Sequence, residues 1–328
     1  MQEYESIIFE QYDIEVISTR KVRGAVLCEA EQGLFLLKEA QGETRHFTGL
    51  CRLYEYLEEQ NWCGVDRILP NKEEKYITEA RDGAKYLLKK WYAGKECDVR
   101  KTGEILNATG MLAKLHLIMP QNVNWEVAKA EPIDQIYQRH NREMNRVRKF
   151  ARGISPKGTF EVEFLKCFEE VAAWATAAEN LLEEFEYQKF LEENIQKGYL
   201  VHGEYNYHNV LMNEGVVAIT NFEKFKANIQ VEDLYYFLRK IMEKYGWKER
   251  LGDNMLNAYS AVKPLTEKEL EYIKIRLVYP EKIWKIANSY YQSNKAWVSA
   301  KNVEKLEVAI RQSKEKERFL KNIFACNL

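Results

Sequence analysis

The segment His202-Gly203-Glu204-Tyr205-Asn206-Tyr207-His208-Asn209 is the stretch of this 328-residue sequence that decides the fold. It sets a glycine and a carboxylate directly after a histidine, and it ends in an amide side chain five residues after that carboxylate. An apolar run at 216–219 then leads into Thr220-Asn221-Phe222-Glu223, in which Asn221 lies twelve residues after Asn209. A turn at 213–215 predicts a hairpin between the two parts, so the polar side chains at their ends are expected to converge.

Upstream of this segment, the first ninety residues are expected to form short strands around one helix. Apolar runs bounded by glycine-containing turns indicate hairpins, with strands expected at 14–17, 25–30, 34–38 and 84–88. Gly24 lies in the first of these turns, and Lys38 ends the third apolar run. Apolar residues then recur at helical spacing between 46 and 60.

Beyond residue 100 the pattern is mainly helical. Apolar residues at intervals of three and four predict amphipathic helices, expected at 102–116, 161–187, 231–245 and from 302 to the C-terminus. Thr266-Glu267-Lys268-Glu269 has the sequence of a capping box, which predicts a helix start. Strands followed by helices predict an α+β fold.

These features resemble the aminoglycoside and choline phosphotransferase branch of the protein-kinase-like fold. Its catalytic loop reads H-G-D-x-x-x-x-N, and the strand after it ends in I-D-F/W-E. Leu112-Ala113-Lys114-Leu115-His116 is similar to a helix end of the same family. The resemblance implies a bilobal structure, with a small antiparallel-sheet N-lobe over residues 1–92. A larger, mainly helical C-lobe over residues 93–328 would carry the catalytic-loop segment.

The resemblance implies catalytic and metal-binding roles for four residues. Glu204 stands where the family has the aspartate that accepts the proton of the acceptor hydroxyl, and Asn209 matches a magnesium ligand. Asn221 stands where the family has its main magnesium-binding aspartate, and Glu223 is a further candidate ligand. The extra methylene of Glu204 moves its carboxylate by about 1 Å, a misplacement that can cost on the order of 10²-fold in rate. Asn221 removes a negative charge that magnesium favours.

On the nucleotide side, the resemblance implies that Lys38 pairs with phosphates and that Gly24 lies beside them. Trp91 lies in the expected hinge. A lysine at a strand end is more often simply solvated, and a lone glycine in a hairpin is ordinarily a turn residue. The carboxylate partner of Lys38 on the first helix is left open between Glu43 and Glu55.

Two further residues are expected to support the loop. His202 opens it, and Asp233 matches an aspartate that holds the catalytic loop in this superfamily. The alternative interpretation of the motif is a buried histidine and asparagine whose polar atoms bond only to the backbone.

Three other stretches resemble the CotS-type spore coat proteins of endospore-forming bacteria. They are Asp-Leu-Tyr-Tyr-Phe-Leu-Arg-Lys at 233–240, Tyr-Pro-Glu-Lys-Ile-Trp-Lys-Ile-Ala-Asn-Ser-Tyr-Tyr at 279–291, and Lys-Ala-Trp at 295–297. The resemblance implies expression during sporulation, synthesis in the cytoplasm and a place in or under the spore coat. Partners would be other coat proteins or an unknown small-molecule ligand.

Many members of this family keep both site aspartates, and this chain keeps neither. The sequence therefore predicts a degenerate phosphotransferase that acts as a coat-assembly or binding scaffold, with weak or absent binding of ATP and Mg²⁺. The alternative is an active ATP-dependent phosphotransferase on a small-molecule or glycan hydroxyl.

Composition excludes several other classes. The formal net charge is −1, which gives no global attraction to nucleic acid. Apolar runs stay far below the ~20 residues of a membrane span, and the N-terminus does not have the pattern of a signal peptide. The six cysteines have no C-x-x-C spacing, which argues against zinc or a disulfide framework. A basic helical stripe is formed by Arg139, Arg142, Arg146 and Lys149, with Arg148 and Arg152 nearby. It is either a solvated face or a docking site for an anionic partner.

Overall fold

The computed structural model describes residues 3–40, 44–62, 64–213, 215–293 and 300–327. The chain divides into two compact units, each built from two separate segments. The first unit comprises Met1–Lys129 and Lys197–Ala227, and the second comprises Ala130–Gln196 and Asn228–Leu328. The lobe boundary expected after residue 92 stays a prediction, and the catalytic-loop segment lies in the first of these two units.

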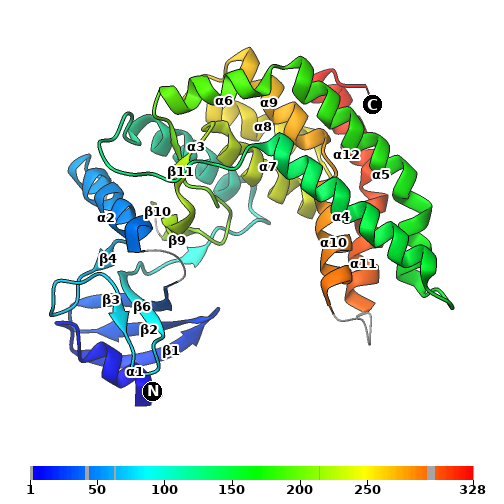
Figure 1. Ribbon diagram of the computed structural model, residues 1–328. Helices are drawn as coiled ribbons and strands as arrows, with labels where there is room; N and C mark the ends of the chain where they lie inside the picture. The colour runs from blue at the N-terminus through cyan, green and yellow to red at the C-terminus, as the bar shows by residue number, and fades with distance from the viewer. Residues whose placement is uncertain (1–2, 41–43, 63, 214, 294–299, 328) are drawn as a thin grey trace. The chain divides into compact units, whose positions relative to one another are not determined.

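The first unit is built on an antiparallel sheet with strand order β1-β2-β3-β6-β4, and β5 pairs with β6 (Figure 1). Its strands are β1 (Val16–Val22), β2 (Ala25–Ala30), β3 (Gly33–Glu39), β4 (Ile68–Leu69), β5 (Thr78–Glu79) and β6 (Lys85–Lys90). Arg23 and Gly24 connect β1 to β2 with φ of 33° and 74°. Positive φ at both turn residues matches the twist of a two-residue hairpin. The expected antiparallel N-terminal sheet is confirmed.

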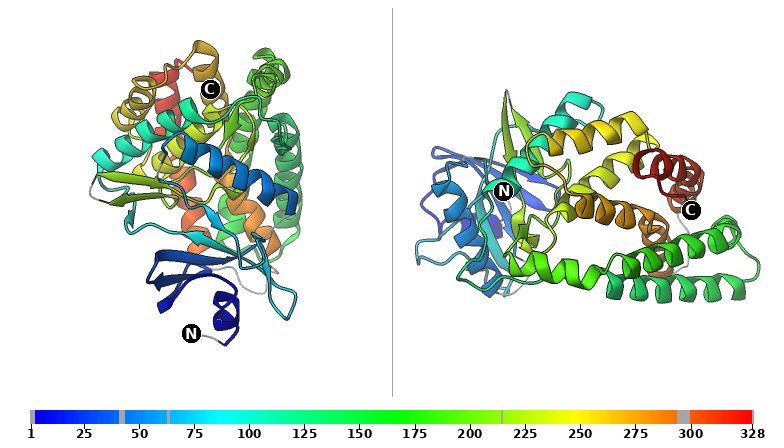
Figure 2. Two further views of the ribbon diagram at one scale, coloured as in Figure 1. Left: turned by 90° about the vertical axis from the view of Figure 1, so that its left-hand side faces the viewer. Right: turned by 90° about the horizontal axis from the view of Figure 1, so that it is seen from above.

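Alternation along the strands gives this sheet two different faces. Phe35, Leu37 and Leu88 pack on one face against α1 (Glu3–Phe9), which lies along the sheet in Figure 2. Successive side chains of a strand point to opposite faces. Lys38 in β3 and Lys89 in β6 therefore share the other face, next to each other because Lys38 pairs with Leu87 and Lys89 pairs with Leu36.

Shorter elements complete the first unit. The helix expected at 46–60 is α2 (Thr44–Glu59), and the one expected at 102–116 is α3 (Thr102–Ile118). The catalytic-loop segment lies between β8 and a hairpin of β9 and β10. The remaining elements are β7 (Lys95–Glu96), β8 (Leu200–Val201), β9 (Val210–Asn213), β10 (Val216–Ile219), the short 3₁₀ helix η1 (Phe222–Lys224) and β11 (Lys226–Ala227).

The second unit is helical in the residues that the structure describes (Figure 1). Its helices are α4 (Ile133–Gly153), α5 (Thr159–Glu184), α6 (Tyr187–Gln196), α7 (Val231–Tyr245), α8 (Glu249–Ser260), α9 (Glu267–Val278), α10 (Glu281–Gln292), α11 (Ala300–Arg311) and α12 (Ser313–Phe324). The capping box at Thr266 is present at the start of α9. The helix expected at 161–187 ends earlier, because Glu186 has a left-handed φ of 54° that separates α5 from α6. The last expected helix is divided into α11 and α12.

Over the described ranges, no helix combines the length and the apolar character that a bilayer crossing requires.

Candidate functional site

The first two residues of the motif shape the loop. His202 is buried directly after β8, donates from Nε2 to the Thr220 carbonyl oxygen at 2.9 Å, and accepts the Glu204 backbone N–H at Nδ1 at 3.2 Å. Gly203 has a φ of 81°, and a Cβ there would lie 2.0 Å from the Lys224 carbonyl oxygen. Histidine therefore ties the loop to the β10 end, and only glycine fits the approach of the η1 backbone.

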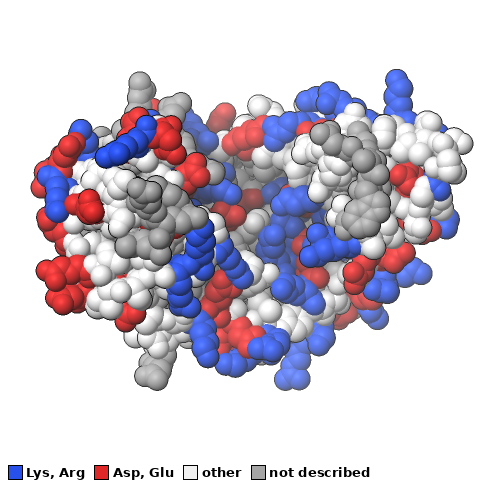
Figure 3. All heavy atoms as spheres, turned by 90° about the horizontal axis from the view of Figure 1, so that it is seen from below, with Lys and Arg blue, Asp and Glu red and all other residues white. Residues whose placement is uncertain are grey.

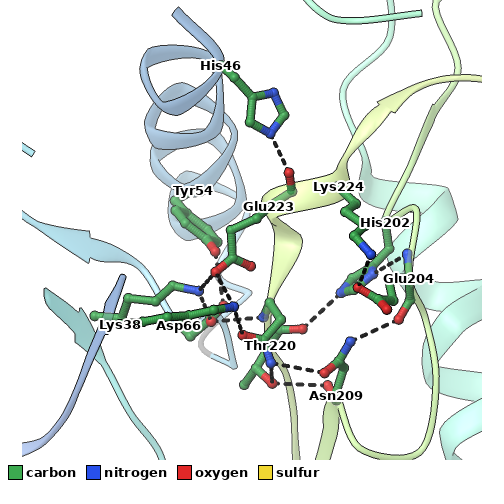
Figure 4. Close-up of polar contacts among 12 residues, drawn as sticks. Lys38, His46, Tyr54, Asp66, His202, Glu204, Asn209, Thr220, Glu223 and Lys224 are labelled. Carbon is green, nitrogen blue, oxygen red and sulfur yellow. Dashed lines mark hydrogen bonds and ion pairs between the residues drawn. The ribbon is translucent and has the colours of Figure 1, made fainter. Parts of the chain in front are cut away.

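Asn209 and Asn221 face each other across the β9–β10 hairpin (Figure 4). Asn221 Nδ2 donates to Asn209 Oδ1 at 2.9 Å, and Asn209 Nδ2 donates to the Glu204 carbonyl oxygen at 2.9 Å. Asn221 has a φ of 65°, a left-handed conformation that asparagine tolerates better than most residues. The two amides thus bond to each other and to the loop backbone.

A chain of alternating charges lies beside this amide pair (Figure 4). Lys38 Nζ lies 3.1 Å from Glu223 Oε1 and 3.4 Å from Asn221 Oδ1. Lys89 Nζ lies 2.8 Å from the same Glu223 oxygen and 2.5 Å from Asp66 Oδ2. Lys89 and Asp66 are fully buried, whereas the Lys38 side chain is 38% exposed. Of these four charged side chains, Lys38 is therefore the one that a ligand could reach.

Neighbouring groups fix the two acidic residues, Asp66 and Glu223, in place. Tyr54 of α2 donates its hydroxyl to Asp66 Oδ1 at 3.0 Å, and the Asn221 backbone N–H donates to Asp66 Oδ2 at 2.8 Å. His46, also in α2, contacts the Glu223 carbonyl oxygen through Nε2. Helix α2 thus holds this site through a tyrosine and a histidine.

Partners stabilise the charges of Glu223 and Lys89 against burial, whereas burial outweighs Lys89 at Asp66 and raises the pKa of that carboxyl. Burial alone would raise the pKa of Glu223, but the ammonium groups of Lys89 and Lys38 outweigh it and lower that pKa to about 2. Burial also opposes the charge on Lys89, but the Asp66 and Glu223 carboxylates outweigh it and raise the pKa of Lys89. A buried charge persists only when it is paired and hydrogen-bonded in this way.

The candidate base is held in an ion pair. Glu204 Oε2 lies 2.9 Å from Lys224 Nζ, at the end of η1. The Glu204 side chain is 35% exposed, so its carboxylate borders open space while it contacts the lysine. The ion pair holds Oε2 of this carboxylate at the lysine and not at a substrate hydroxyl.

A cavity of about 520 Å³ brings most of the expected residues together. Its lining residues are Arg23, Gly24, Lys38, Glu39, Phe47, Leu87, Glu204, Asn206, His208, Asn209, Asn221, Glu223 and Lys224. Its volume falls within the range of small-molecule pockets. The cationic and anionic side chains in the lining are equal in number, so the pocket carries little net charge.

Other expected residues lie elsewhere. Among the described residues, Trp91 is not part of the cavity lining, and its backbone N–H donates to the Leu34 carbonyl oxygen at 2.8 Å. Asp233 is buried in α7 of the second unit, so its support of the loop stays a prediction. Glu55 is exposed and accepts a hydrogen bond from Tyr76, and Glu43 lies outside the described residues. The carboxylate that pairs with Lys38 is Glu223 instead.

Sequence reasoning missed Asp66 and Lys89. The strand expected at 84–88 extends to Lys90 in the structure, so Lys89 shares a face with Leu87 rather than opening the hinge. Strand parity was the signal that could have found it. The sequence around Asp66 does not indicate its role, because its contacts are with Tyr54, Lys89 and Asn221, which lie in three other segments.

Mg²⁺ takes octahedral coordination and is usually held by one or two carboxylates together with phosphates and water, and the described side chains leave it few available oxygens. Asn209 Oδ1 is taken by the Asn221 amide, and Glu223 Oε1 lies between two ammonium groups. Glu223 Oε2 is buried and has no hydrogen-bond partner among the described residues, which leaves one carboxylate oxygen for an ion. Within the described ranges, no cluster of three or more His, Cys, Asp or Glu side chains is placed to hold a metal.

The basic stripe on α4 is partly neutralised. Of the stripe residues, Arg139 is paired with Glu131, whereas Arg142, Arg146 and Lys149 are exposed. The neighbouring Arg148 is paired with Glu169. Lys and Arg occur together with Asp and Glu over the face drawn in Figure 3, in keeping with the net charge of −1.

The sheet, the loop and the hairpin that meet at this cavity define a kinase-like phosphotransferase fold. An aminoglycoside phosphotransferase from Alicyclobacillus acidocaldarius has this fold, with a TM-score of 0.85 at 17% identity, over 98% of this chain and 95% of that one. Spectinomycin phosphotransferase, solved with ADP and spectinomycin, has a TM-score of 0.58 at 13% identity, over 94% and 97% of the two chains. At 17% and 13% sequence identity, these similarities show a shared fold and nothing further.

A family model places the chain more closely. The model described as "Spore coat putative kinase YutH" matches residues 5–323, so the protein belongs to this spore coat kinase family. The chain is also 28% identical over 167 residues to spore coat protein S of Bacillus subtilis (strain 168). That match covers 50% of this chain and 48% of the relative, about half the length of each. The resemblance to spore coat proteins with a kinase-like fold is confirmed.

Proposed function

We propose that this protein is a degenerate phosphotransferase of the spore coat, a kinase-fold scaffold that binds a coat component or a small ligand without phosphoryl transfer. The observation that carries the proposal is the hydrogen bond between Asn221 Nδ2 and Asn209 Oδ1 at 2.9 Å. In an active site of this fold, both positions present oxygens to magnesium. Here the Asn221 amide N–H donates to Asn209 Oδ1, so that oxygen is not presented to a metal ion.

The Glu204–Lys224 ion pair supports the same proposal. A general base has to come within hydrogen-bond distance of the proton it abstracts. Glu204 instead contacts Lys224 at 2.9 Å. Turnover would have to use a carboxylate whose Oε2 is held by that ion pair, in addition to the misplacement that the longer side chain brings. Membership of the spore coat kinase family supports a place in the coat.

The alternative is an active phosphotransferase on a small-molecule or glycan hydroxyl. Glu223 Oε2 is the observation that favours it, because this buried carboxylate oxygen has no hydrogen-bond partner. Lys38 also remains available to phosphates. This alternative requires Glu223 to replace Asn221 as the metal ligand.

Consumption of ATP with magnesium and a panel of hydroxyl acceptors separates the two functions. The comparison uses the wild type, Glu204→Asp, Asn221→Asp and the double variant. We expect no turnover in the wild type and little in the single variants, because groups that act as one unit are not additive. The double variant should gain activity, since it returns both the shorter base and the metal-binding charge. Wild-type turnover near about 1 s⁻¹, the low end for kinases, would refute the scaffold proposal.

A further inference from the structure

We infer that a cavity of the second unit binds a short-chain carboxylate, formate or acetate, with Arg239 and Lys316 as its hydrogen-bond donors. The cavity is lined from α5, α7, α10, α11 and α12 and from the turns beside them (Figure 1). All of these elements belong to the second unit, whereas the proposed function concerns the cavity of the first. Failure of either proposal therefore leaves the other intact.

Arg239 of α7 brings an unused N–H donor to the cavity. Its side chain is 4% exposed, and its Nη1 donates to Glu243 Oε1 at 2.5 Å. Its Nε is buried and has no hydrogen-bond partner among the described residues. A buried donor without an acceptor costs free energy. A ligand oxygen that accepts this N–H would remove that cost.

Lys316 of α12 brings a second donor. Its Nζ donates to the carbonyl oxygens of Val278 and Tyr279 at 3.2 and 3.1 Å. An ammonium has three N–H donors, so these two carbonyls leave one for a ligand. The indole rings of Trp174 and Trp247, whose centres lie 4.7 and 5.6 Å from Nζ, also line the cavity. Because the lysine is half-buried, a small solute can reach it.

The carboxylates of the lining do not take up these two donors. The charged groups that line the cavity with the lysine are Glu170 of α5, Arg239 and Glu243 of α7, and Glu281 and Lys282 of α10. Glu243 is paired with Arg239 and, at 3.3 Å, with Lys282. Glu281 is paired with Lys285 at 3.3 Å. The remaining carboxylate is exposed, so solvent and salt screen its charge.

The volume of the cavity and its apolar lining define the ligand. The volume is about 40 Å³, and one water needs roughly 10–15 Å³, so about three or four heavy atoms fit. Formate and acetate have this size and carry a single negative charge, whereas inorganic phosphate is larger and carries more charge. Val171, Ile283 and Ala309 are buried in the same lining and give the methyl group of acetate an apolar contact.

The proton of Lys316 couples this binding to pH. Burial lowers the pKa of Lys316 to about 7, and the Glu243 carboxylate only partly opposes this effect. A bound carboxylate raises that pKa, because an opposite charge favours the ammonium form. Above about pH 7, binding therefore takes up a proton, and the affinity falls by up to about tenfold per pH unit.

Titration of the full-length protein with acetate at constant ionic strength tests the inference. At about pH 6.5 we expect a saturable change in tryptophan fluorescence, with a dissociation constant of roughly 0.1–10 mM for so few atoms. At about pH 8 the binding should be weaker by about tenfold and should take up about one proton per acetate. The uptake is measured as a rise in the pH of a weakly buffered solution.

The neutral isostere acetamide provides the matched ligand control, and we expect no saturation by acetamide in the same concentration range. Three results would overturn the inference. They are the absence of saturation by both formate and acetate, equal binding of acetamide and acetate, and an acetate affinity that does not change between pH 6.5 and about pH 8.

Lys316→Met removes one of the two donors. We expect it to weaken acetate binding by at least about tenfold and to abolish the proton uptake. Lys314→Met is the matched control, because it makes the same substitution at an exposed position of the same helix and should bind as the wild type does. Binding by Lys316→Met with unchanged affinity and proton uptake would place the ligand elsewhere and refute the site.

Arg239→Lys tests the other donor and also serves where Lys316→Met does not fold. It keeps a positive charge opposite Glu243 but has no N–H at the position of Nε. We expect acetate to bind about tenfold more weakly, with the pH dependence retained because Lys316 is still present. Unchanged affinity in the folded Arg239→Lys variant would contradict the role of this arginine and thus the inference.

Discussion

Asn221 differs from an aspartate by one atom, and that atom changes what the position can do. Its Nδ2 donates to Asn209 Oδ1 at 2.9 Å. With a carboxylate at 221, two acceptor oxygens would face each other, and a cation or a proton would be needed between them. The amide removes that need. The single-residue change thus explains both the closed metal position and the charge balance around Glu223.

Acid titration tests the charge balance at the same scale. The pKa of Glu223 is lowered to about 2 by Lys89 and Lys38, against burial, whereas an unfolded glutamate has a pKa of about 4.3. Between pH 2 and about pH 4.3, the Glu223 carboxylate is protonated in the unfolded state but not in the folded state. The free energy of unfolding therefore falls as the pH decreases through this range. We expect Glu223→Gln to remove that component of the pH dependence of unfolding.

The matched control is Glu39→Gln, which removes an exposed carboxylate from β3. Its unfolding free energy should follow the wild type between pH 2 and about pH 4.3. Equal pH profiles for Glu223→Gln and the wild type would contradict the strong pairing.

At the scale of elements, a lysine from one helix caps the end of another. Lys316 of α12 donates to the carbonyl oxygens of Val278 and Tyr279 at 3.2 and 3.1 Å, where α9 ends. The last carbonyls of a helix lack partners within it, and a cation there also suits the helix dipole. Trp174 and Trp247 lie 4.7 and 5.6 Å from the ammonium. The contact joins helices that are distant in sequence.

Alkaline titration tests this contact. Burial lowers the pKa of Lys316 to about 7, and the nearby Glu243 only partly opposes it. An unfolded lysine keeps its proton to a pKa of about 10.4, so the unfolding free energy should rise with pH between these values. The slope for one proton cannot exceed about 1.4 kcal/mol per pH unit. Lys316→Met should show a flatter profile, and a wild type that is flat over this interval would show that the amine stays charged.

At the scale of the whole molecule, the chain combines a phosphotransferase fold with membership of a spore coat family. Its two compact units are interleaved in sequence, since the chain leaves the first unit after Lys129 and returns to it at Lys197. A scaffold acts through its surface, whereas an enzyme acts through its cavity. The two functions therefore predict different effects of a change confined to the cavity.

Purified spores provide the test at this scale. We expect both the wild type and Lys38→Met in the coat fraction in equal amounts, because Lys38→Met alters one cavity cation and leaves the surface intact. Immunodetection of the protein in coat extracts is the measurement. Absence of the wild type from the coat fraction would contradict the proposed location. Loss of Lys38→Met alone would show that assembly depends on the ligand of the cavity.

The central motif and several of the elements followed from sequence, because they depend on contacts between near neighbours. The hairpin after Asn209, the antiparallel N-terminal sheet, α2, α3 and α7 all leave periodic or turn signals. Gly203 and His202 were recognisable because a fixed local backbone requires them. The resemblance of the loop then led to the kinase-like fold.

The charge arrangement was decided only by tertiary structure. Whether Lys89 is a solvated hinge residue or a buried cation depends on Asp66 and Glu223, which are 23 and 134 residues away from it in the chain. A charged side chain can be buried only where an opposite charge lies beside it. The local sequence around Lys89 does not show which distant residues lie next to it in the fold. For the same reason, the partner of Lys38 was sought on the first helix and lies instead at Glu223, beyond the catalytic loop.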